Sequence, residues 1–290
     1  MGFIHNPHGD EAVRISIGFT VAGNLVVLLR LYCRIFLVRL IGTEDWCITV
    51  GMLCSTAFTI LVKVQADAGL GVHEWELTQE ELLKPLKAFY ASLIFYNMTL
   101  ALVKASFLFQ YNRLFVGNRT RMAIYIVGAI ILLFSIETVV VSVFMCIPIK
   151  KFWVPSLPGF CVDKRPLWFT NSSLHIVTDI AIFIIPMPEL SHLKLPRGQK
   201  IALLLVFACG FFACVTSIVR LHTLIEVSSG KDLTHDNAKT ATWSVGELNI
   251  SLICACLPVL RPLLAHLVPQ LLHTSTRIKQ AEWQAMINFH

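Results

Sequence analysis

Charged residues are scarce in this chain, and several long stretches contain none at all. Charged side chains make up 14% of the 290 residues, hydrophobic side chains make up 56%, and the mean hydropathy is +0.69. A water-soluble protein of this length could not cover its surface with so few charges. The composition therefore excludes a soluble protein and predicts an integral membrane protein.

The sequence also lacks the usual signatures of metal, nucleotide and nucleic-acid sites. It has no His-Glu-x-x-His pair, no phosphate-binding glycine loop and no Cys/His cluster with metal spacing. The net charge of +6 is spread over short segments without a polybasic block, which is typical of membrane topology rather than nucleic-acid binding. We therefore expect no metal, no cofactor and no nucleic-acid partner. The expected partner at this point is the lipid bilayer.

Seven apolar stretches are each close to the roughly 20 residues that span a bilayer as a helix. They cover residues 15–38, 46–66, 87–114, 122–146, 167–188, 200–226 and 241–266. Because the connecting segments are short, we predict an all-α polytopic membrane protein with a seven-transmembrane-helix bundle at residues 15–266. Residues 1–14, which lack the apolar core of a signal peptide, form a short extracytosolic N-terminus, and residues 267–290 form a short cytosolic tail.

The charges of the connecting segments favour an N-terminus outside and a C-terminus in the cytosol. This orientation places eleven Lys and Arg residues on the cytosolic side and nine on the outer side. Cys146 and Cys161 bracket a polar loop and are the one plausible disulfide, which requires an oxidising compartment on the outer side. The glycosylation sequon at Asn118 then lies in the cytosol and is expected to stay unmodified.

The third apolar stretch contains a lysine in its interior. Tyr90, Asn97, Lys104 and Tyr111 recur at intervals of seven and therefore share one side of a helix. A lysine in hydrocarbon costs roughly 2.5–3.5 kcal/mol on insertion scales. This side must therefore face a protein interior that supplies partners or water, and other helices must surround this one.

Four further ionisable residues fall inside the predicted spans, namely Glu137, Asp179, Arg220 and Glu247. With a helical rise of 1.5 Å per residue, Arg220 and Glu247 lie about two turns from the outer end of their helices. Lys104 and Asp179 lie deeper and at a common level. We therefore predict an outer Arg220–Glu247 pair and an inner Lys104–Asp179 pair, since pairing is the usual way that buried charges are carried. Glu137 stands alone, and we expect a structural role for it.

Polar residues extend these pairs along the same helix faces. Asn171 and His175 precede Asp179 at four-residue intervals, and Trp243 precedes Glu247 in the same way. One interpretation is a shared cavity that binds a small molecule or carries proton chemistry, and the other is a buried hydrogen-bond network that fixes helix packing. We expect the cavity, because four helices contribute to it. The candidate catalytic residues are Asp179, Glu247 and His175, and the candidate ligand-binding residues are Lys104, Asn97, Tyr111, Arg220 and Trp243.

A set of landmarks in fixed order resembles the fungal rhodopsin-like integral membrane protein family. The matching residues include Arg30, Arg34, Glu44, Asp45, Trp46, Lys104, Ser106, Tyr111, Arg113, Cys146, Pro148, Cys161, Asp179, Pro186, Arg220, Trp243, Glu247, Pro258 and Arg261. The resemblance runs from about residue 14 to residue 266. The family includes Pth-type receptor-like proteins and membrane proteins encoded in secondary-metabolite clusters. It tends to carry asparagine four residues before the fifth-helix aspartate, where this chain has His175, which can exchange protons near neutral pH.

The resemblance implies two kinds of function. Retinal binding is not expected, because the seventh span has no lysine between Thr240 and His266. The first function is a membrane component of secondary-metabolite biosynthesis that handles a small apolar metabolite, as a cyclase or isomerase with buried acid/base groups. The second is a receptor-like sensor of a small ligand. The chain lacks the cysteine-rich domain and long tail of the receptor-like branch, which favours the biosynthetic function over the sensor. We expect the protein in the endoplasmic reticulum or the plasma membrane.

Overall fold

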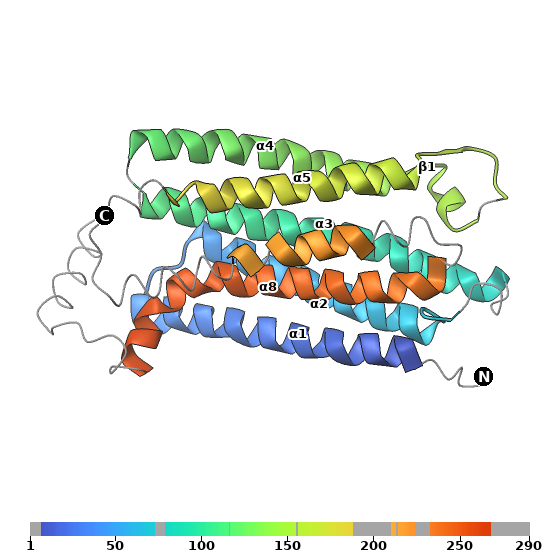
Figure 1. Cartoon of the computed structure of the whole chain (residues 1–290). Coiled ribbons are helices and arrows are strands. Elements are labelled where there is room, and N and C mark those ends of the chain that lie inside the picture. The colour runs from blue at the N-terminus through green and yellow to red at the C-terminus, as the bar shows by residue number, and fades with distance from the viewer. Residues whose placement is uncertain are drawn as a thin grey trace, which may run out of the picture.

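The computed structural model describes residues 7–72, 79–115, 117–154, 156–187, 210–212, 214–223 and 233–267. Long helices lie side by side and form one all-α bundle (Figure 1). Within the described residues, six helices are long and apolar enough to cross a membrane: Gly9–Val38, Thr43–Asp67, Leu82–Leu114, Asn118–Val143, Arg165–Ile184 and Asn237–Leu260. They coincide with six of the predicted spans, so the prediction of a multi-pass all-α membrane protein is confirmed.

The helices follow the predicted order along the chain. They are α1 (Pro7–Tyr32), which continues into the π-helical turn η1 (Cys33–Val38), then α2 (Thr43–Asp67), α3 (Gln79–Leu114), α4 (Asn118–Val143), α5 (Lys164–Ile184) and α8 (Leu233–Leu267). The predicted span 200–226 lies largely outside the described residues, although residues 210–212 and 214–223 are helical. Most of the predicted tail, from residue 268 onward, also lies outside them, and the orientation of the termini stays a prediction.

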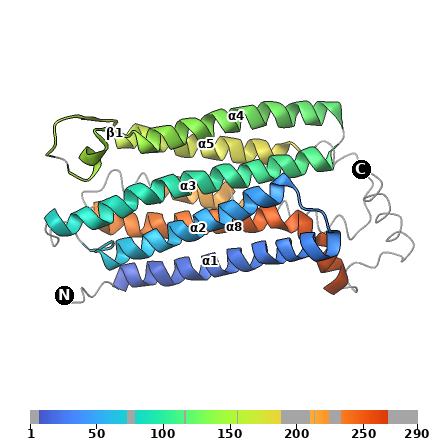
Figure 2. The same cartoon turned by 180° about the vertical axis from the view of Figure 1, so that it is seen from behind.

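Helix α3 lies in the middle of the bundle. It contacts α2, α4, α5 and α8, and both views place it between the α4–α5 pair and the layer that holds α2 and α8 (Figures 1 and 2). The third predicted span is therefore surrounded by other helices, as its buried lysine requires.

Helix α8 supplies much of the apolar interior. Val245, Leu248, Leu252 and Ala255 recur at helical spacing and have no exposed surface, because α8 packs against α1, α2 and α3. In its most apolar window 67% of the residues are buried, against 17% for α4. Helix α8 is thus an interior helix, whereas α4 presents most of its surface to the outside of the bundle.

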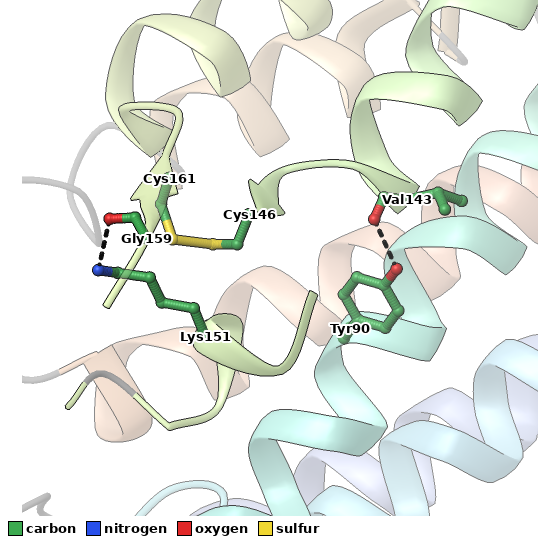
Figure 3. The surroundings of a disulfide bond; sticks show 6 residues. All are labelled: Tyr90, Val143, Cys146, Lys151, Gly159 and Cys161. Carbon is green, nitrogen blue, oxygen red and sulfur yellow. Dashed lines mark hydrogen bonds between the residues drawn. A yellow bond between two sulfur atoms is a disulfide. The ribbon is translucent and has the colours of Figure 1, made fainter. Parts of the chain in front are cut away.

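A short disulfide-bonded hairpin follows α4. Strands β1 (Cys146–Ile147) and β2 (Phe160–Cys161) are antiparallel, Cys146 pairs with Cys161, and the predicted disulfide joins them (Figure 3). Gly159 has a φ of 153° and lies against the carbonyl oxygen of Ile147, so a side chain cannot be placed there without a clash. The Lys151 ammonium donates to the Gly159 carbonyl oxygen at 2.7 Å. We call the end of the bundle that carries this hairpin the hairpin end.

The hairpin and Asn118 lie at opposite ends of α4, which is about 39 Å long for its 26 residues. If the hairpin lies on the outer side, the sequon at Asn118 is cytosolic and stays unmodified. We expect an engineered sequon in the hairpin, Ser156→Asn with Pro158→Thr, to be glycosylated in a fungal host. The measurement is a gel-mobility shift that an endoglycosidase reverses. Sugar on Asn118 in the unaltered chain would instead show that the orientation is inverted.

Candidate functional site

The inner predicted ion pair is present between α3 and α5. Lys104 Nζ lies 3.0 Å from Asp179 Oδ1, and the lysine side chain is only 4% exposed. Lys104 also donates to the Thr178 hydroxyl at 2.6 Å and to the His175 carbonyl oxygen at 3.0 Å. The His175 ring nitrogen Nδ1 lies 3.4 Å away. Every hydrogen of the ammonium therefore has an acceptor, which is what a lysine at this depth requires.

The outer predicted pair is also present, and it has a larger set of partners. Arg220 Nε lies 3.6 Å from Glu247 Oε2 and donates to the Ser244 hydroxyl at 3.1 Å. Glu247 is almost fully buried, and it accepts hydrogen bonds from the Tyr96 hydroxyl at 2.6 Å and the Ser217 hydroxyl at 2.5 Å. The Arg220 guanidinium carbon lies 4.0 Å from the centre of the Tyr96 ring, within the range of a cation–π contact.

Ser217 connects the two pairs. Its hydroxyl oxygen lies 2.5 Å from Glu247 Oε1 and 3.5 Å from Asp179 Oδ2. The side chains of Lys104, Asp179, Ser217, Glu247 and Arg220 thus form one connected set, which we call the charge network. The two predicted layers of charge therefore belong to one network, because the Ser217 hydroxyl lies between the carboxylates of Asp179 and Glu247.

A pocket lies between this network and the hairpin end. Its cavity volume, counted as room for the centre of a water-sized group, is about 60 Å³, so it can hold several such groups. Its walls come from α2, α3, α5 and α8, with Arg220 and the residues around the start of the hairpin. Aromatic and aliphatic side chains such as Phe58, Phe89, Leu93 and Met145 form much of the lining. The pocket is therefore suited to a largely apolar molecule.

The predicted site residues separate into three groups. Asn97, His175 and Arg220 line the pocket. Lys104, Asp179 and Glu247 do not line it. Lys104 contacts His175, Glu247 contacts Arg220, and Asp179 is one step further away, paired with Lys104. Tyr111 and Trp243 reach neither the pocket nor the network: Tyr111 is buried in an apolar cluster with Phe115 and Ile124, and Trp243 is 42% exposed. Both residues lie on the predicted helices at the predicted spacing, but this spacing does not bring their side chains to the pocket or to the charge network.

Three buried polar atoms around the pocket have no hydrogen-bond partner among the described residues. They are Trp168 Nε1, His175 Nε2 and Thr240 Oγ1. Neither Trp168 nor Thr240 was among the predicted site residues. Tyr96 was also missed, because the seven-residue pattern of α3 selects the face toward α4 and α5, whereas Tyr96 contacts Glu247 of α8. The repeat Ser92, Tyr96 and Thr99 is the signal that could have identified this second face. Ser217, on the helical segment 214–223, was not among the predicted site residues either.

A second charged cluster lies at the opposite end of the bundle, where α1, α2, α3 and α8 meet. Arg30, which has no exposed surface, pairs with Asp45 at 2.8 Å and donates to the Ala255 carbonyl oxygen at 2.7 Å. Glu44 accepts from Arg34 at 3.0 Å and from Arg113 at 2.9 Å. Arg34 and Arg113 are among the eleven Lys and Arg residues that the predicted orientation places on the cytosolic side, and tertiary contacts bring both into ion pairs.

The described residues contain no group of three His, Cys, Asp or Glu side chains placed to hold a metal ion.

No solved structure matches the chain. Receptor GIN3 of Arthrobotrys oligospora is 29% identical over 259 residues, which cover 88% of this chain and 62% of that protein. Fugralins biosynthesis cluster protein 2 of Gibberella zeae is 28% identical, with 87% and 65% covered.

A SAT4 family membrane protein of Emericella nidulans is 26% identical over 71% of this chain and 53% of its own. The chain thus spans roughly half to two thirds of the length of these three relatives. The model of the fungal rhodopsin domain matches residues 29–266, which include α2 to α8, the hairpin, the charge network and the pocket. The match covers most of the chain, and the chain therefore belongs to the fungal rhodopsin domain family.

Proposed function

We propose that the protein binds a small, largely apolar metabolite in the pocket and acts in a fungal secondary-metabolite biosynthetic pathway. The observation that carries this proposal is an apolar pocket whose inner wall contains His175 and Arg220, each backed by a buried ion pair. Such a site provides both burial for an apolar body and polar groups for orientation. Relatives named for biosynthesis clusters of fugralins, polyenoic acids and wortmanamides support the same assignment.

The finer part of the proposal is an isomerisation or cyclisation with His175 as the general acid/base. His175 lines the pocket and its Nδ1 lies beside Lys104, so in this proposal Nε2 is the nitrogen that acts on the metabolite. When Nε2 gives its proton to an oxygen of the metabolite, Nδ1 can accept a proton from the Lys104 ammonium, and the reverse transfers restore both groups. An isomerisation then consumes no net proton. Arg220, also on the wall, stabilises negative charge that develops on the substrate.

This chemistry predicts a specific defect in His175→Asn. The amide keeps a hydrogen-bond donor and an acceptor but cannot exchange a proton, so conversion should fall by about 10²–10⁴-fold while the fold is kept. The measurement is untargeted metabolite profiling of a deletion strain complemented with wild type, His175→Asn or Trp46→Phe. Trp46 is 67% exposed and serves as the matched control.

The expected result is that an unclosed or unrearranged isomer accumulates in the deletion strain and in the His175→Asn strain, but not in the control strain. Immunoblots of the membrane fraction must show equal protein. If the metabolites of a whole pathway rise or fall together, or if His175→Asn restores the product fully, the proton chemistry is wrong.

The alternative function is a receptor-like sensor that uses the same pocket. The similarity to Receptor GIN3 favours it, and so does the charged cluster of Arg30, Arg34, Glu44, Asp45 and Arg113 at the opposite end of the bundle. A ligand in the pocket could move α3, which contributes Lys104 and Tyr96 near the pocket and Arg113 at the other end. The coordinated rise or fall of a pathway, without an accumulated isomer, is the result that this function predicts.

A further inference from the structure

We infer that the ligand of this pocket is an apolar molecule with neutral acceptor oxygens, such as those of ketones, that receive hydrogen bonds from His175 and Trp168. The inference rests on the proposed function in one respect, because it concerns the same pocket. It goes further by naming the chemical group that the site recognises.

The partners of His175 determine which ring nitrogen faces the pocket as a donor. Lys104 carries only donors, so a hydrogen on Nδ1 would point at the ammonium 3.4 Å away, which favours Nδ1 as the ring nitrogen without a hydrogen. A neutral imidazole with an acceptor Nδ1 carries its hydrogen on Nε2. His175 is 6% exposed and lines the pocket, and its Nε2 has no partner among the described residues. A buried N–H donor is therefore available in the pocket wall.

Trp168 supplies a second donor in the same pocket. An indole Nε1–H can only donate, and this atom is also buried without a partner in the described part of the chain. The indole ring is oriented by an edge contact with Phe89, whose ring centre lies 6.1 Å away at an interplanar angle of 79°. Because buried donors without acceptors cost free energy, two of them in one pocket indicate a ligand that brings an acceptor.

The charges nearby indicate that this acceptor is neutral. Arg220 is the cation in the pocket lining, and it is already paired with Glu247 and hydrogen-bonded to Ser244. A carboxylate ligand would have to compete with Glu247 for Arg220 and would bring a further negative charge close to it. Thr240, whose hydroxyl has no partner among the described residues, can donate or accept and adds no charge. Carbonyl oxygens on an apolar skeleton satisfy such donors without these costs.

Benzophenone is a suitable probe, because its carbonyl group is both the acceptor and the photoreactive centre. The purified full chain in lipid nanodiscs is irradiated with increasing benzophenone, and cross-linked peptides are quantified by mass spectrometry. Diphenylmethane, which has the same two rings and no oxygen, is the competitor. We expect cross-links on the peptides that contain His175, Trp168 or Thr240. We also expect diphenylmethane to compete at concentrations at least about 2- to 12-fold higher, as the loss of one or more hydrogen bonds implies.

Two variants test the donors separately. Trp168→Phe keeps an aromatic ring and removes one N–H, and His175→Phe removes the ring nitrogens while the backbone acceptor of Lys104 remains. At least one of them should raise the half-saturating benzophenone concentration by about 2- to 12-fold, because the single carbonyl group loses its donor. Trp46→Phe, at an exposed position, should leave it unchanged. Equal competition by diphenylmethane, cross-links outside the pocket, or no effect of both variants would overturn the inference.

These results are separable from those of the proposed function. Donor-dependent binding of benzophenone together with an unchanged metabolite profile in the deletion strain would retain the acceptor site and reject the biosynthetic role. An accumulated isomer in that strain, together with oxygen-independent binding, would retain the biosynthetic role and reject the acceptor site.

Discussion

Asp45→Asn is expected to lower the free energy of unfolding by about 3–5 kcal/mol, because it leaves Arg30 buried without its counter-ion. Both side chains are inaccessible to solvent, at 0% and 1% exposure, and Arg30 Nη2 lies 2.8 Å from Asp45 Oδ1. Water cannot replace the lost charge at this position. The amide has only one oxygen, so it cannot accept both from Arg30 and from the Gly42 backbone N–H, which donates to Asp45 Oδ2 at 3.0 Å at the start of α2.

The measurement is the unfolding of the detergent-purified chain, followed by fluorescence-detected size exclusion or by titration with denaturing detergent. Arg113→Gln is the matched control in the same cluster, because the Arg113 side chain is 39% exposed and its pairing with Glu44 is worth about 0–1 kcal/mol. The double variant Arg30→Gln/Asp45→Asn should recover a large part of the loss. If Asp45→Asn lowers the free energy of unfolding no more than Arg113→Gln does, the buried Arg30–Asp45 pair does not stabilise the packing of α1, α2, α3 and α8.

The second large effect is expected for Asp179→Asn, which removes the counter-ion of Lys104 in the middle of the bundle. Lys104 would keep its neutral acceptors, but its positive charge would remain buried at 4% exposure, so we again expect a loss of about 3–5 kcal/mol. The reciprocal variant Lys104→Met should cost less. Asp179 is 23% exposed, and the Ser217 hydroxyl lies 3.5 Å from it, so the remaining carboxylate is partly solvated.

The double variant Lys104→Met/Asp179→Asn distinguishes pairing from independent packing. Its unfolding free energy should be higher than that of Asp179→Asn alone, because no charge is then left unpaired between α3 and α5. A charge swap is a poorer test, since an aspartate at position 104 could not donate to the His175 and Thr178 oxygens that Lys104 contacts. Additive losses in the double variant would contradict the pairing.

The sequence by itself determined the class of the protein and the depth of its charges. Hydrocarbon excludes charged side chains and requires continuous helices, so composition and run length are enough to predict a multi-pass bundle. The rise of a helix is constant, so the levels of Lys104, Asp179, Arg220 and Glu247 could be compared before any fold was known, and both pairs are present. The disulfide could also be predicted from the sequence, because Cys146 and Cys161 bracket one polar loop.

Only the tertiary structure decided which helix faces meet. Rotation about a helix axis and the lateral order of helices depend on packing between distant segments, which helical spacing does not encode. For this reason Tyr111 and Trp243 matched the periodicity of the candidate site but lie away from the pocket, while Tyr96 and Ser217 entered the network unpredicted. Arg30 is the clearest case. It belongs to the first predicted span, and only the packing of α2 and α8 against α1 buries it in contact with Asp45 and the Ala255 carbonyl oxygen.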